Sequence, residues 1–169
     1  MKVIEAILNR RSVRKYLNKA VEEDKICEIL ESAMAAPSAV NKQPWEFYVV
    51  KNPEVQDKLR ESTPYTNFNS PLIIIVAGNK ERFLPDEKEG FWVQDCSAAA
   101  QNILISAASL ELGTCWCGLY PKAEAVRAVR DILSLSEEII PLALIHIGYP
   151  ESELDARTQY NEDYVHIIE

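Results

Sequence analysis

The hydrophobic positions of this chain recur at helical spacing in some stretches and form continuous runs in others. The longest helical stretch covers residues 91–112, which contain no Gly, no Pro and no basic residue. At 100° per residue, one of its sides collects Trp92, Cys96, Ala99, Ala100, Ile103, Ala107 and Leu110. The other side is polar but barely charged, with Gln94, Asp95, Asn102, Ser106 and Ser109. We predict a buried central helix with Gly113 in the C-terminal glycine position, whose small residues let a second helix approach closely.

Shorter elements follow from the same patterns. Helical spacing predicts helices over residues 2–9, 22–35, 52–62 and 122–133. β-Branched and aromatic runs predict strands over residues 45–50, 72–77, 114–119 and 140–147. The 72–77 run is typical of a central strand buried on both faces, and Pro141 indicates an edge strand or the beginning of a strand. The alternation of helices and strands, without a repeat or linker, predicts one mixed α and β domain over residues 1–169.

Composition and charge exclude several classes of function. The chain has 169 residues, enough for one domain with a core, and a net charge of −8, which lacks the basic face that nucleic acid requires. Recurring polar residues argue against a membrane-spanning helix, and the N-terminus does not resemble a secretory signal. We therefore expect a cytoplasmic protein with four reduced thiols, at Cys27, Cys96, Cys115 and Cys117. The CxC spacing is a poor zinc pair by itself, so no metal is expected.

A basic cluster near the N-terminus stands out in this acidic chain. Arg10, Arg11, Arg14 and Lys15 place four cations around Ser12. Arginine side chains bind phosphate oxygens in pairs, and a serine hydroxyl adds a donor, so the cluster predicts a phosphate or other anion site. The alternative is that these cations only stabilise the C-terminal end of the helix predicted before them.

A polar loop between Pro37 and Pro44 presents further donors, from Ser38, Asn41, Lys42 and Gln43. Such a loop can bind the polar edge of a planar heterocycle, or it can be an ordinary connection between a helix and a strand. Gly113 and Gly118 flank a short predicted strand, so its backbone can approach a ligand closely.

Motifs for other chemistries are missing from the sequence. There is no GxGxxG, no phosphate-binding loop and no GxSxG, and His146 and His166 are the only histidines. Neither histidine forms a persuasive triad with a nucleophile. Any chemistry therefore belongs to a bound cofactor.

In their order along the chain, these motifs resemble the flavin-dependent nitroreductase family. The resemblance is carried by residues 10–16 (RRSVRKY), 36–45 (APSAVNKQPW), the Ala-rich helix, 113–118 and Gly148-Tyr149-Pro150. It implies an α+β nitroreductase-like fold, with a central sheet flanked by helices around a long central helix. It also implies an obligate homodimer with two FMN sites at the subunit interface, and residues 150–169 docking on the partner subunit.

The resemblance also assigns site residues by position. The residues that would bind the FMN phosphate and the ribityl and pyrimidine end are Arg10, Arg11, Ser12, Arg14 and, from the tail, Arg157. The proline-bracketed loop of the partner subunit would line the flavin. Its assigned residues are Pro37, Ser38, Ala39, Asn41 and Gln43. Asn67 would contact the ring edge, with Asn69 as a rival. The backbone of Cys117 and Gly118 would lie beside flavin N5, so no catalytic side chain is required.

The activity implied is ping-pong hydride transfer through flavin N5. NADH or NADPH gives a hydride and leaves, and a nitroaromatic, quinone or related acceptor is then reduced in the same place. Many family members have Glu where this chain has Cys117, so the role of that side chain is open. The alternatives are a specialised flavin dehalogenase or enone reductase, a flavin-binding protein with little turnover, and a plain anion-binding domain. The expected partners are a second copy of the chain and a small-molecule acceptor, without nucleic acid or membrane.

Overall fold

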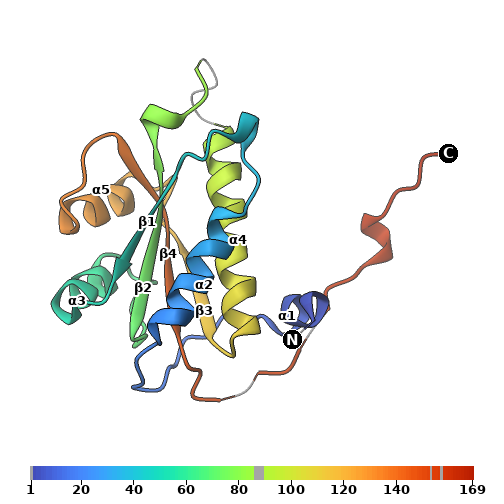
Figure 1. The fold of residues 1–169 in the computed structure, drawn as a ribbon, viewed down its shortest axis with the longest axis horizontal. Helices are drawn as coiled ribbons and strands as arrows, with labels where there is room; N and C mark the ends of the chain where they lie inside the picture. The colour runs from blue at the N-terminus through green and yellow to red at the C-terminus, as the bar shows by residue number, and fades with distance from the viewer. Residues whose placement is uncertain (1, 86–89, 153, 157) are drawn as a thin grey trace.

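The computed structural model describes residues 2–85, 90–152, 154–156 and 158–169, and it has three layers (Figure 1). The middle layer is an antiparallel sheet of β1 (Trp45–Val50), β2 (Leu72–Asn79), β3 (Gly113–Gly118) and β4 (Ile139–Gly148). One face is covered by α2 (Glu23–Met34) and α4 (Phe91–Ser109), the other by α3 (Pro53–Glu61) and α5 (Ala123–Ile132). The short helix α1 (Val3–Asn9) lies beside α4. The predicted α+β class is confirmed.

The strand order is β1-β2-β4-β3, so β2 and β4 are interior strands. Every residue of β2 except Asn79 is buried, which confirms the central strand predicted for 72–77. Of the two interpretations of Pro141, the edge strand is wrong, because β4 pairs with neighbours on both sides, and the position near the beginning of a strand is confirmed. Pro141 lies opposite Ala77, where the register between β2 and β4 shifts. The regular ladder is interrupted there, so the missing proline N–H is tolerated.

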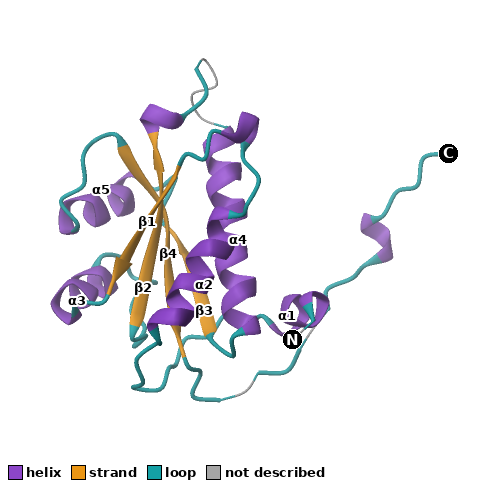
Figure 2. Ribbon diagram, in the orientation of Figure 1, coloured by secondary structure: helices purple, strands orange, loops and turns teal. Residues whose placement is uncertain are grey.

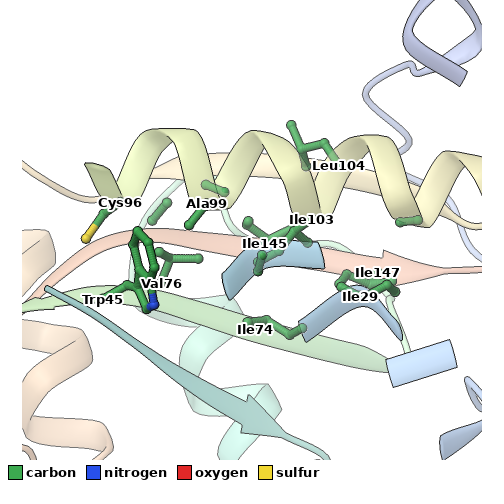
Figure 3. Packing of buried hydrophobic residues seen from close by; sticks show 14 of the residues in the cluster. Ile29, Trp45, Ile74, Val76, Cys96, Ala99, Ile103, Leu104, Ile145 and Ile147 are labelled. Atoms are coloured by element: carbon green, nitrogen blue, oxygen red, sulfur yellow. The ribbon is translucent and has the colours of Figure 1, made fainter. Parts of the chain in front are cut away.

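Helix α4 packs its predicted apolar side against the sheet. Ala99 and Ile103 point toward Ile145 and the neighbouring strand β2 (Figure 3). Burying one such Ile side chain stabilises the fold by about 1.5–3 kcal/mol. The buried residues of the helix are Trp92, Asp95, Cys96, Ala99, Ala100, Ile103, Leu104 and Ala107. Asp95 departs from the predicted division of the helix into an apolar and a polar side. It was predicted on the polar side, but it is buried and brings a charge into the core.

The C-terminal end of α4 differs from the sequence prediction. Glu111, not Gly113, takes the left-handed conformation, with φ 64°. The N–H groups of Glu111 and Leu112 donate to the carbonyls of Ala108 and Ala107, which is the Schellman arrangement. Gly113 instead begins β3, and close packing explains why this position is a glycine. An added Cβ would lie 2.5 Å from Val13 Cγ2.

Two segments of the single copy expose apolar side chains to solvent. The exposed apolar side chains of α1 are Val3, Ile4, Ile7 and Leu8, and those of the tail include Tyr160, Tyr164, Ile167 and Ile168. In Figure 1 the tail passes α1 and runs away from the sheet. Apolar side chains this exposed are typical of surfaces that pack against another chain. Within the described residues, no helix has the length and apolar character needed to cross a membrane.

Candidate functional site

The basic segment, residues 10–16, lies along the outer edge of β3. Ser12 forms a parallel bridge with Thr114, and the N–H of Val13 donates to the Thr114 carbonyl at 2.8 Å. Tyr16 holds the other end of the segment, because it is 1% exposed and its hydroxyl donates to the Val13 carbonyl at 2.6 Å. Burial raises the pKa of this hydroxyl, so it remains a neutral donor. The side chains of Ser12 and Arg14 stay exposed beside β3.

A hollow of about 750 Å³ opens between this segment, the end of α4 and the residues after β4. Arg10 and Arg11 line it together with Thr114. Arg11 donates to the backbone carbonyl of Asp155 rather than to a carboxylate. In the described part of the chain, no ion pair includes any cation of this segment: Arg10, Arg11, Arg14 or Lys15.

These cations therefore keep their charge available for a ligand. Guanidinium groups without an ion-pair partner have paired donors that match phosphate oxygens, so this segment is a candidate anion site, although Glu111, Glu151 and Asp155 also line the hollow. The alternative of a helix-end effect explains little, since the last turn of α1 contains no basic residue and only Arg10 caps it.

The free edge of β3 presents backbone donors beyond Thr114. In an antiparallel pair, alternate residues bond to the neighbouring strand and the residues between them face the other way. The Thr114 carbonyl faces outward, since it accepts from Val13, so the N–H of Gly118 also faces outward. The residues between these face the neighbouring strand β4. Leu119 is one of them, and its N–H donates to the Leu142 carbonyl at 2.9 Å. Of the two predicted backbone positions, Cys117 bonds within the sheet, and exposed Gly118 offers its N–H at the edge.

The side chain of Cys117 points away from that edge, into the core on the α5 side of the sheet. Its Sγ donates to the carbonyl of Tyr65 at 3.3 Å. Contact with the Cys117 thiol lowers the pKa of Cys115, whereas the same contact and burial raise the pKa of Cys117. Cys117 is therefore a neutral, buried thiol near pH 7. Its side chain is not placed to act as a nucleophile at the open edge.

The proline-bracketed loop lies at the other end of α4 (Figure 2). The N–H of Ala39 donates to Asp95 Oδ1 at 2.9 Å, near the beginning of the helix, whereas the basic segment lies near its end. From Asp95 to Ser109 the helix rises about 20 Å, at 1.5 Å per residue. One copy of the chain therefore does not bring the basic segment and the loop together.

The remaining predicted residues divide between free and engaged side chains. Asn67 is exposed and makes no hydrogen bond within the described residues. Asn69 uses both ends of its amide on the backbone of Tyr16. Arg157 lies outside the described residues.

Sequence reasoning missed the role of Asp95. The residue was assigned to the polar side of the helix, but it is only 7% exposed and binds the loop backbone. The available signal was its charge, because Asp95 is the single charged residue between Phe91 and Leu110. A lone acid in a helix otherwise free of charge indicates a specific partner.

Comparison with known proteins gives one consistent result. The model of the Nitroreductase family matches residues 7–63 and 64–149. A protein of Methanothermobacter thermautotrophicus with the provisional name NADH dehydrogenase/NAD(P)H nitroreductase is 43% identical, over 99% of this chain and 87% of its own length.

Solved structures agree with the fold. A provisionally named NADH oxidase from Clostridium acetobutylicum superposes with a TM-score of 0.91 at 40% identity, over 97% of this chain and 99% of the other. A provisionally named nitroreductase from Desulfovibrio desulfuricans, solved in complex with FMN, has a TM-score of 0.83 at 28% identity, over 100% and 98% of the two chains.

Proposed function

Since this chain belongs to the nitroreductase family, we propose that it is an FMN-dependent oxidoreductase. It takes electrons from NADH or NADPH and passes them to a nitroaromatic, quinone or related acceptor. Residues 1–169 form one FMN-binding domain that works as a homodimer. The four cysteines are free thiols, which fits a cytoplasmic protein.

The observation that carries this proposal is the set of cations in residues 10–15 that form no ion pair within the described residues, two of which, Arg10 and Arg11, line the hollow at the edge of β3. Arg10 and Arg14 bind the FMN phosphate and the adjoining part of the cofactor, and the exposed Ser12 hydroxyl adds a neutral donor. Arg11 belongs to the same set, and Arg157 of the tail joins it. The residues present fit the group, since its doubly charged phosphate needs cationic donors and this segment supplies them.

The ring system of FMN lies along the free edge of β3 in this proposal. The outward N–H of Gly118 is the donor for flavin N5, and the neighbouring Cys117 contributes backbone only. An alanine Cβ at Gly118 would meet nothing nearer than Trp116 Nε1 at 4.0 Å, so there is room beside this glycine. Asn67 is the side chain for the ring edge.

A second copy of the chain completes the site. The loop residues lie too far along α4 to reach the basic segment of their own copy: Pro37, Ser38, Ala39, Asn41 and Gln43. A partner with α4 in the opposite direction brings its loop to that segment. The exposed apolar residues of α1 and the exposed tail support this dimer, with residues 150–169 docking on the partner.

Bound FMN supplies the redox chemistry, because it can accept a hydride from a nicotinamide and return it to an acceptor. The protein binds the cofactor and orients it. The guanidinium groups hold the phosphate, and the Gly118 N–H aims a dipole at the place where negative charge develops during transfer. The buried thiol of Cys117 takes no part, so reduction requires no side-chain nucleophile.

The test is to add FMN to the purified apoprotein, remove unbound FMN and mix the complex with NADH or NADPH without oxygen. We expect a yellow protein that bleaches with at least one nicotinamide and regains its colour with an acceptor. A colourless protein that takes up no FMN would refute the proposal. A yellow protein that neither nicotinamide bleaches would instead be a flavin-binding protein without reductase activity.

A further inference from the structure

The loop from Ser38 to Gln43 has an unusual backbone. Three of its residues, Val40, Asn41 and Gln43, have positive φ values of 51°, 55° and 48°. A β-branched residue such as Val40 is a genuine outlier in the left-handed region. Its side chain is 81% exposed, so packing of that side chain within its own copy does not compensate for the conformation. Backbone of this kind persists where surrounding contacts impose it, and it clusters at functional sites.

Several hydrogen bonds hold this loop. Ser38 Oγ accepts from the N–H of Gln43 at 2.9 Å, within the loop. Arg82 donates to the Gln43 carbonyl at 3.2 Å, from an exposed position. Asp95 is different, because it is 7% exposed and its Oδ1 accepts from the N–H of Ala39 at 2.9 Å. It is the buried attachment of the loop to α4.

The surroundings of Asp95 do not otherwise explain a carboxylate. Its helical neighbours Trp92, Cys96 and Ala99 belong to the apolar core. No ion pair among the described residues includes Asp95. A buried carboxylate costs free energy unless its hydrogen bonds offset the loss of water. The hydrogen bond from the Ala39 N–H is what stabilises it.

We propose that Asp95 is a positioning residue, which holds the Ser38–Gln43 loop in its left-handed shape so that the loop can contact the FMN site of a second copy. This inference rests on the proposed function. Asp95 would not touch FMN itself. It presets the loop before the cofactor binds, so FMN does not have to order the loop.

The experiment compares Asp95→Ala and Asp95→Asn with Asp131→Ala. The last variant also removes one negative charge, but at an exposed position at the end of α5, on the other side of the sheet. Hydrogen exchange of the Ala39 amide is measured on each apoprotein, and the FMN dissociation constant is measured by flavin fluorescence. Sedimentation reports whether each variant is still a dimer.

In Asp95→Ala we expect the Ala39 amide to exchange about tenfold faster and FMN to bind about tenfold more weakly, with the dimer retained. Asp95→Asn keeps an acceptor oxygen and should recover most of both losses, which also covers the case in which the alanine variant does not fold. Asp131→Ala should match the wild type. Unchanged exchange and FMN affinity in Asp95→Ala would overturn the inference.

Failure of the proposed function gives a different result. If the wild type itself binds no FMN, the proposed cofactor is wrong, and the exchange of Ala39 still reports whether Asp95 holds the loop. If FMN binds to the wild type and to Asp95→Ala equally, while Ala39 exchanges faster, Asp95 holds the loop but the loop does not serve the cofactor. That outcome would overturn the positioning role alone.

Discussion

Both ends of the Asn69 side-chain amide are hydrogen-bonded to the backbone of Tyr16. Oδ1 accepts from the Tyr16 N–H at 3.1 Å, and Nδ2 donates to the Tyr16 carbonyl at 2.8 Å. The two residues are 53 positions apart, so this pair ties the basic segment to the loop before β2. It also separates two asparagines that the sequence alone could not distinguish, because exposed Asn67 keeps its amide available.

Replacing these asparagines should therefore affect different properties: Asn69 the stability of the fold, and Asn67 the binding of FMN. Asn69→Ala removes two hydrogen bonds and should lower the free energy of unfolding by about 2 kcal/mol. Asn67→Ala should change it by less than about 0.5 kcal/mol while it weakens FMN binding. Chemical denaturation of the apoproteins and FMN titration measure the two quantities. A large loss of stability in Asn67→Ala, or unchanged FMN affinity, would contradict this assignment.

Removing a cation from the basic segment should weaken FMN binding without unfolding the protein. Arg10→Ala and Arg14→Ala each lose a hydrogen bond from a charged group, worth about 1.5–3 kcal/mol, so the dissociation constant should rise by roughly one to two orders of magnitude. Arg127→Ala is the control, because Arg127 is exposed on α5, on the other side of the sheet. If all three variants bind FMN as the wild type does, the phosphate lies elsewhere.

His146 makes the stability of the protein depend on pH. It is fully buried in β4, with Nδ1 2.7 Å from Ser70 Oγ, and burial lowers its pKa from 6.5 to about 4. The folded state therefore keeps the imidazole neutral while the unfolded chain binds a proton. The contribution is complete above pH 6.5 and is lost as the pH falls toward 4, by up to about 3 kcal/mol.

The variant His146→Gln isolates this effect. Because Gln does not titrate, the stability difference between the wild type and the variant should shrink by about 3 kcal/mol from pH 6.5 to 4. Denaturant unfolding at several pH values measures it. Parallel pH profiles for the two proteins would show that His146 is not the titrating group.

Two glycines at the ends of β3 should respond differently to alanine. In Gly113→Ala the new Cβ would lie 2.5 Å from Val13 Cγ2, so overpacking should cost about 1–3 kcal/mol. Adding Val13→Ala removes the 2.5 Å contact with Cγ2 but leaves the Cβ of residue 13 at 2.8 Å, so it should restore only part of that loss. Gly118→Ala has space and should change stability by less than about 1 kcal/mol, although it should weaken FMN binding. Equal destabilisation by both substitutions would contradict the packing at Gly113.

Much of the fold was predictable because it depends on local patterns. The apolar spacing of α4, the run that forms β2 and the proline-bracketed loop were all visible in the sequence. The errors have a common cause. Pro141 and Gly113 were interpreted from the residue type alone, whereas a register shift in the sheet and the close approach of Val13 decide what each residue does.

The site was predictable only in part, for the same reason. The cations of residues 10–15 were evident as a cluster, but their lack of carboxylate partners in the described chain is a property of the fold. The side chains of Asp95 and Asn69 act on backbone groups far away in sequence, at Ala39 and Tyr16, and no local pattern records such a partner. The separation of the loop from the basic segment depends on the direction of α4, which spacing does not give.

The central claim is that each FMN site is built from two copies of the chain. Mixed dimers test it most directly, with Arg10→Ala and Arg14→Ala in one copy and Ser38→Ala and Asn41→Ala in the other. Each variant alone should bind FMN weakly. The mixed dimer has one site with both halves intact and should bind one FMN with nearly the affinity of the wild type. A mixed dimer that binds FMN no more tightly than its two parents would contradict the claim.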